Sequence, residues 1–126
     1  MTMKRALTLI VVRPGPLRDG IEALLASVPD VEVLGKTAWA SQALSLATQR
    51  TPDLLLLEAG LQGRASWRVL GHLHTEHPGL RSIVLADDTE QVREARAAGA
   101  DAVLLKGFPP DRFVRTVERL VSRDQV

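Results

Sequence analysis

A single carboxylate, Glu58, lies at the kind of position where α/β proteins usually carry their functional residues. It directly follows four leucines, residues 54–57, and a continuous apolar run of this length is typical of a strand buried in a parallel sheet. The carboxyl ends of such strands form the edge at which open α/β sheets bind their ligands. The function of the chain therefore depends on whether this carboxylate is reactive or only paired with a cation.

The other polar residues do not indicate an enzyme site. His72, His74 and His77 lie two and five positions apart on an expected helix, so they point in separate directions and are expected to be solvated rather than to bind one metal ion. The pair Asp87-Asp88 fits the N-cap and acidic first turn of a helix. The sequence contains no Ser-His-Asp order, Walker loop, dinucleotide fingerprint or suitably placed pair of catalytic carboxylates. We expect no enzymatic activity, no metal ion and no cofactor.

Composition predicts one ordinary domain, residues 1–126. The hydrophobic content of 45% in 126 residues is enough for a core of normal size. Sixteen Lys and Arg against 15 Asp and Glu give a formal charge of +1, which does not indicate binding to nucleic acid or to a membrane surface. The absence of cysteine and the short N-terminal apolar stretch, residues 6–12, favour a soluble cytoplasmic protein.

Short apolar segments alternate with amphipathic segments along the whole chain. Strands are predicted at residues 7–12, 31–34, 53–57, 82–85 and 102–105, and helices at 17–27, 40–49, 66–77, 90–98 and 111–122. Pro and Gly residues fall between these segments. This alternation predicts an α/β domain with a parallel five-stranded sheet and helices on both faces.

Five correctly spaced segments carry a family resemblance: residues 16–20, 29–35, 52–57, 97–101 and 104–106. On these segments the chain resembles the receiver domain of bacterial response regulators, and in particular the receivers that precede a LuxR-type helix-turn-helix output domain. The resemblance implies a single flavodoxin-like (βα)5 domain with strand order 2-1-3-4-5.

The resemblance also implies a site. Receivers use an Asp that accepts a phosphoryl group, two acidic residues that hold Mg²⁺, a hydroxyl residue, an aromatic switch residue and a Lys. In this chain Glu58 takes the place of the acceptor Asp, and Arg13 and Pro14 take the places of the two acidic residues. Ala86 replaces the hydroxyl residue, Val103 replaces the aromatic residue, and Lys106 matches the Lys. Only the lysine is retained, so the resemblance points to a degenerate receiver, or pseudo-receiver.

The formal charges at these positions favour an inactive site. Two acids, one acceptor Asp and one Lys sum to about −2, whereas Arg13, Glu58 and Lys106 sum to about +1. Like charges some 4 Å apart repel by roughly 4 kcal/mol at an effective dielectric constant near 20. We therefore expect that Mg²⁺ is repelled and that Glu58 is not phosphorylated. Glu58 then either imitates a phosphorylated Asp through Lys106 or forms a structural ion pair with Lys106 or Arg13.

Two tryptophans have different expected roles. Trp39 lies in a loop at the carboxyl edge, where it either contacts a partner or folds over the emptied pocket. Trp67 precedes Leu70 and Leu73 at helical spacing, which predicts a role in the core.

The last predicted helix offers a candidate interface. Its apolar stripe is broader than one buried face needs and consists of Phe113, Val114, Val117, Leu120 and Val121. The resemblance implies a homodimer through this helix together with the first or the fourth. The alternative is that the stripe lies wholly in the core and the charged residues form a solvated face.

Three functions remain open. The chain is a phosphorylation-independent signalling and dimerisation module in transcriptional regulation, a phosphoacceptor receiver with a divergent site, or a regulatory domain that binds a small anion at Arg13 and Lys106. The expected partners are an output domain, for which a linker would begin after Val126, or a separate partner protein. Residues 1–126 contain no helix-turn-helix and are not expected to contact DNA.

Overall fold

A computed structural model describes residues 5–122 as five parallel strands alternating with five helices. The elements are β1 (Ala6–Val11), α1 (Pro16–Ala26), β2 (Val31–Thr37), α2 (Ala40–Gln49), β3 (Leu54–Glu58), α3 (Ala65–Glu76), β4 (Arg81–Ala86), α4 (Thr89–Ala97), β5 (Ala102–Leu105) and α5 (Pro110–Ser122). The sheet order is β2-β1-β3-β4-β5, and every neighbouring pair is parallel. The predicted class and strand order are confirmed.

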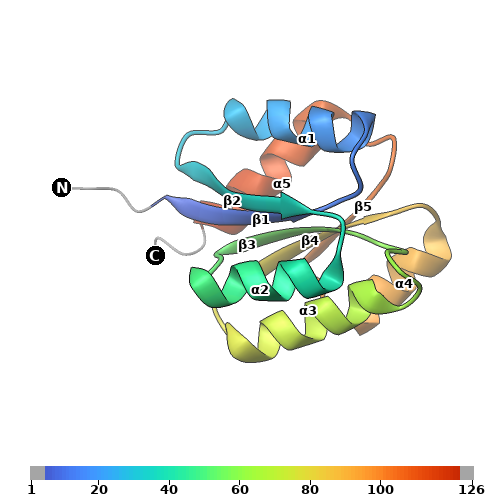
Figure 1. Cartoon of the computed structure of the whole chain (residues 1–126). Helices are drawn as coiled ribbons and strands as arrows, with labels where there is room; N and C mark the ends of the chain where they lie inside the picture. The colour runs from blue at the N-terminus through green and yellow to red at the C-terminus, as the bar shows by residue number, and fades with distance from the viewer. Residues whose placement is uncertain (1–4, 123–126) are drawn as a thin grey trace.

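The sheet lies between two layers of helices. Helices α1 and α5 cover one face, and α2 and α3 cover the other (Figure 1), where α4 also packs through Ala95. Every residue of β3 is buried. A strand that is covered on both faces needs apolar side chains at every position, which explains its unbroken run of leucines.

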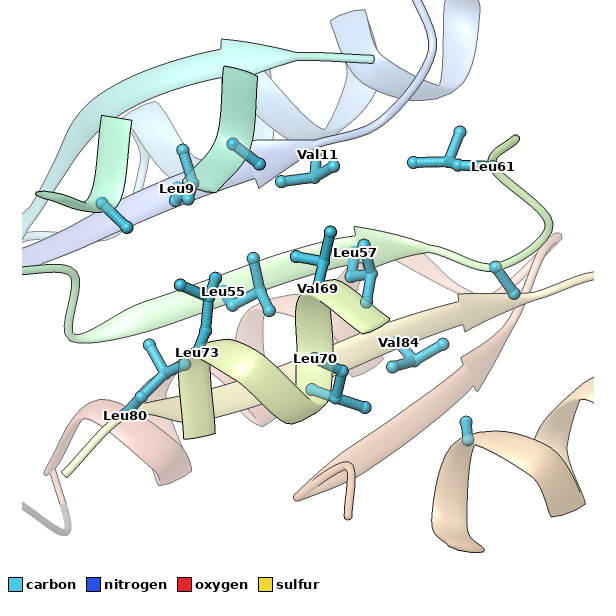
Figure 2. Close-up of a cluster of buried hydrophobic side chains, with 14 residues drawn as sticks. Leu9, Val11, Leu55, Leu57, Leu61, Val69, Leu70, Leu73, Leu80 and Val84 are labelled. Atoms are coloured by element: carbon cyan, nitrogen blue, oxygen red, sulfur yellow. The ribbon is translucent and has the colours of Figure 1, made fainter. Parts of the chain in front are cut away.

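Two core clusters follow from the alternation of side chains along the strands. Leu55 and Leu57 point toward α2 and α3, where they meet Val69 and Leu73 (Figure 2). The other two leucines of β3, Leu54 and Leu56, belong to the second cluster, together with Phe113 of α5.

The predicted boundaries are correct to within one residue except at β2, which continues to Thr37 rather than ending at residue 34. The register between β1 and β2 shifts at Gly35, after which Thr37 pairs with Val11. Gly35 also permits close packing, because a Cβ there would lie 3.1 Å from a methyl group of Leu46. The second strand was predicted too short because this irregularity interrupts its alternating pattern.

The carboxyl ends of all five strands lie along one edge of the sheet (Figure 1), so residues that follow different strands meet there. None of the described helices is both long enough and apolar enough to cross a lipid bilayer.

Candidate functional site

Glu58 is the last residue of β3, and its side chain is only 5% exposed. The neighbouring strands supply the residues around it. Arg13 follows β1, which pairs directly with β3, and Lys106 follows β5. The parallel order thus brings these three positions together at the carboxyl edge, as predicted.

Four hydrogen bonds satisfy the Glu58 carboxylate. The Arg13 backbone N and Nε donate to Oε1 at 2.9 and 3.2 Å, while Arg13 Nη2 and Lys106 Nζ donate to Oε2 at 2.9 and 2.6 Å. Burial alone would raise the pKa of Glu58, but the hydrogen bonds from Arg13 and Lys106 outweigh it and lower the pKa to about 2. Glu58 therefore forms an ion pair with both of the cations that the sequence offered as alternatives.

Asp87 completes the network. Its Oδ1 lies 2.8 Å from Lys106 Nζ. Burial lowers the pKa of Lys106, but hydrogen bonds with Asp87 and Glu58 outweigh it and hold the pKa above its ordinary value. The sequence pattern predicted that Asp87 and Asp88 together form a helix cap, whereas only Asp88 accepts a hydrogen bond from the Gln91 backbone N–H, at 2.8 Å.

Asp87 also changes the charge of the site. The three receiver positions sum to +1 as predicted, but with the Asp87 carboxylate the four residues of the network sum to zero. The cations of the site are matched by carboxylates and present no large positive field.

The other predicted site residues lie around this network. Ala86 ends β4, is fully buried, and accepts the Lys106 backbone N–H at 2.8 Å. Val103 lies half-buried on β5 and packs against the cluster on the α2 and α3 face. Pro14 is exposed and lines a neighbouring groove, so the structure places Arg13 but not Pro14 against Glu58.

The two tryptophans differ as predicted. Trp67 is half-buried and packs against the core cluster, which confirms its expected role. Trp39 is 61% exposed and borders the same groove as Pro14. An indole this exposed does not fill the volume of an emptied pocket.

One histidine corrects the sequence interpretation. His74 is half-buried, and its Nε2 lies 3.0 Å from the hydroxyl of the fully buried Ser82. The Ser82 amide in turn donates to Asp101 Oδ2 at 2.8 Å. His74 is therefore part of the packing between α3 and β4 and is not simply solvated. Within residues 5–122 no three His, Cys, Asp or Glu side chains are grouped so as to hold a metal ion.

The site does not fit the magnesium ion that the family resemblance implies. Mg²⁺ requires hard oxygen ligands in octahedral geometry. Both Glu58 oxygens accept hydrogen bonds from cations, and Asp87 is paired with Lys106. The Arg13 guanidinium provides donors where the metal would need acceptors.

Comparison with known proteins assigns the chain to a family. Residues 14–118 match the family model described as the response regulator receiver domain. The nitrate/nitrite response regulator NarL of Escherichia coli K12 is 27% identical over all of this chain and 60% of its own length. The transcriptional regulatory protein LiaR of Bacillus subtilis is 30% identical, over 71% of this chain and 44% of LiaR.

A solved structure agrees with these matches. The crystal structure of a LuxR-family DNA-binding response regulator from Staphylococcus aureus aligns with a TM-score of 0.80, at 20% identity, over 91% of this chain and 98% of that one. The chain spans 60% or less of the lengths of NarL and LiaR. Its fold, strand order and matched residues show that it belongs to the response regulator receiver domain family, with similarity to regulators such as NarL.

Proposed function

We propose that this chain is a cytoplasmic receiver domain that works without phosphorylation, as a signalling and dimerisation module of a transcriptional regulator. The observation that carries the proposal is the Glu58 carboxylate, which is buried and accepts four hydrogen bonds from Arg13 and Lys106. The likeness to DNA-binding regulators supports a role in transcription, which would require an output domain or a partner.

The same contacts argue against a phosphoacceptor. Phosphoryl transfer depends on a positioned nucleophile and on cations that neutralise the transferred group. Here the cations already neutralise Glu58, and the buried methyl group of Ala86 cannot donate to a phosphoryl oxygen. The contact of Lys106 with Glu58 gives the imitation of a phosphorylated Asp some support, but Ala86 and Val103 provide neither the hydroxyl nor the aromatic of a switch.

Binding of a small anion at Arg13 and Lys106 is less favoured than the sequence indicated. An incoming anion would compete with two carboxylates that are already in place, because Glu58 and Asp87 make the network neutral. The phosphorylation-independent signalling and dimerisation module is therefore the proposed principal function.

The first prediction concerns the metal and the phosphodonor. Neither 10 mM Mg²⁺ nor inorganic phosphate is expected to raise the melting temperature, and acetyl phosphate with Mg²⁺ is expected to leave the intact mass unchanged. For scale, a ligand that binds the folded state with a Kd of about 1 mM would add about 1.4 kcal/mol at about 10 mM. A thermal shift series and intact mass spectrometry measure both results.

The matched control is the double variant Arg13→Asp, Glu58→Asp, which replaces the guanidinium by a carboxylate, shortens the acidic side chain at position 58, and should gain stabilisation by Mg²⁺. A conventional receiver confirms that the reagents are active. A mass increase of one phosphoryl group on Glu58, or stabilisation of the unmodified chain by Mg²⁺, would refute the proposal.

The described surface favours one of the two predicted dimer faces. A groove of about 610 Å³ runs between α4 and α5 over β5 and includes Leu105, which is 45% exposed. The groove between α5 and the loop that follows α1 has only about 160 Å³. Three residues of the α5 stripe, Phe113, Val117 and Leu120, are fully buried. The interface would therefore form from the rims of the larger groove and from Leu105 rather than from the centre of the stripe.

The second prediction tests this face. The chain is expected to be dimeric at micromolar concentrations without any phosphodonor, and Leu105→Arg is expected to make it monomeric, because a charge would be desolvated at the interface. Size-exclusion chromatography with light scattering measures the mass. Val33→Arg is the control, since Val33 is 42% exposed on β2 at the opposite edge of the sheet. A monomeric parent chain, or dissociation by both variants alike, contradicts the proposed face.

A further inference from the structure

A second groove opens at the carboxyl edge, beside the Glu58 network. It has a volume of about 490 Å³ and lies between the loops that follow β1, β2 and β3. Its lining includes the exposed indole of Trp39, the ring of Pro14 and three cationic side chains, those of Arg13, Arg18 and Lys36. This groove is separate from the groove between α4 and α5, and the proposal made for it does not depend on a metal ion or on phosphorylation.

The lining is cationic and contains no carboxylate. Two carboxylates outside the lining form ion pairs with these cations. Glu58 pairs with Arg13, and the Glu22 carboxylate lies 3.0 Å from Lys36 Nζ. With Arg18, these five residues carry a net charge of +1. The Arg13 and Lys36 side chains remain 53% and 48% exposed, so their cationic groups are oriented by ion pairs and still accessible. Side chains that are already ordered lose less entropy when a partner binds.

Trp39 is exposed but stands on a fixed loop. Its backbone N–H donates to Thr37 Oγ1 at 3.0 Å. Gln62 bridges from the β3–α3 loop, donating to the Ala38 carbonyl at 2.7 Å and accepting from the Ala40 amide at 3.3 Å. None of these bonds uses the indole, so the loop does not need a tryptophan to hold its conformation. A large aromatic side chain that the fold does not bury, on a loop that is held in place, has the properties of a binding anchor.

The geometry identifies the class of ligand. A pocket for a small molecule encloses most of the ligand surface, whereas Trp39, Arg13 and Lys36 each present about half or more of their surface outward. Nucleic acid binding needs many cations aligned along a phosphate backbone, and the net charge of +1 here is too small. A protein segment covers an open groove and can place both apolar and acidic side chains on it.

We propose that this groove docks an acidic segment of a partner protein, in which an apolar or aromatic side chain packs on Trp39 and neighbouring carboxylates contact Arg13 and Lys36. Packing on the indole supplies most of the affinity because it buries the largest area. The carboxylates supply selectivity and speed of association, which makes binding weaker at high salt.

The third prediction uses two fluorescein-labelled synthetic peptides, one in which Glu alternates with Leu and Phe, and a matched peptide with Lys in place of each Glu. By fluorescence anisotropy the full chain is expected to bind the Glu peptide and not the Lys peptide. Trp39→Ala and Trp39→Gln are each expected to weaken binding at least tenfold, because Trp39 is the anchor. Lys36→Ala is expected to weaken it severalfold, and added salt should reduce the affinity further.

Arg50→Ala is the control for charge, because Arg50 is a cation of similar exposure, 55%, that lies outside the groove. It should leave binding unchanged, and circular dichroism should show that every variant keeps its fold. Equal binding of the two peptides, or unchanged binding by folded Trp39 variants, would overturn the proposal. So would displacement of the peptide by glutarate or a short DNA duplex at equal or lower concentration, since the groove would then prefer a small anion or a nucleic acid.

Discussion

Glu58→Gln is expected to remove most of the pH dependence of stability on the acid side. Because the pKa of Glu58 falls from 4.5 to about 2 in the folded chain, its ionised form contributes about 3 kcal/mol to the free energy of unfolding at neutral pH. A lowered pKa in the folded state means that this contribution is complete above pH 4.5 and is lost as the pH falls toward 2. The Gln side chain does not titrate, so the variant cannot lose it.

Urea unfolding between pH 7 and pH 2 measures the effect. The variant should be less stable than the parent chain by about 3 kcal/mol at pH 7, and the difference should shrink to near zero at pH 2. Glu90→Gln is the matched control, because Glu90 pairs with Arg93 on an exposed part of α4 and its side chain is 70% exposed. Surface pairs of this kind contribute little, so the control should follow the parent chain at every pH. A deficit for Glu58→Gln that stayed constant across this pH range would show that the ion pair is not its cause.

The sequence predicted those parts of the fold that depend on local pattern. The leucines of β3 identified a strand buried on both faces because all of them are apolar. The stripe of α5 identified a helix because Phe113, Val117 and Leu120 recur at helical spacing, and all three are fully buried. The strand order came from the family resemblance, because local patterns do not determine which strands pair.

The residues at receiver site positions were predicted, whereas Asp87, which the family pattern did not single out, was missed. Glu58 was identified because it ends a buried strand, whereas Arg13 and Lys106 were assigned through the family resemblance. Asp87 was assigned to a helix cap because its neighbours in sequence suit one, although the strand order already places the end of β4 beside the end of β5. Because β4 and β5 are neighbours, the charged residues that follow them, Asp87 and Lys106, meet at the carboxyl edge.

The completed network connects the carboxyl ends of four strands, since Arg13 follows β1, Glu58 ends β3, Asp87 follows β4 and Lys106 follows β5. Any rearrangement that separated Glu58 from its two cations would leave a buried carboxylate unpaired. A cost of about 3 kcal/mol corresponds to a bias of roughly a hundredfold toward the paired arrangement. The same ion pairs therefore favour one arrangement of this edge, which is what the proposed module that acts without phosphorylation requires.

Phe113→Ala is expected to be the most destabilising of the substitutions considered, at about 3–5 kcal/mol, because deleting a large buried ring removes apolar contacts and leaves a cavity. Phe113 is fully buried at the start of α5, and its ring stacks on that of Phe108 with centroids 5.6 Å apart. Phe108 lines the groove between α4 and α5, so the loss of Phe113 should also disturb the proposed dimer face. Urea unfolding measures the stability, and light scattering measures the dimer.

Val114→Ala is the matched control on the next residue of α5, where the side chain is only half-buried and the expected loss is about 1 kcal/mol. A loss below about 1 kcal/mol for Phe113→Ala would mean that Val117 and Leu120 hold α5 without it. If Phe113→Ala instead lowers stability as expected and the folded variant still dimerises as tightly as the parent chain, the contact between copies does not depend on the α5 end of the groove. The proposed interface would then depend on the α4 residues that line the groove, such as Val92 and Arg96, rather than on α5.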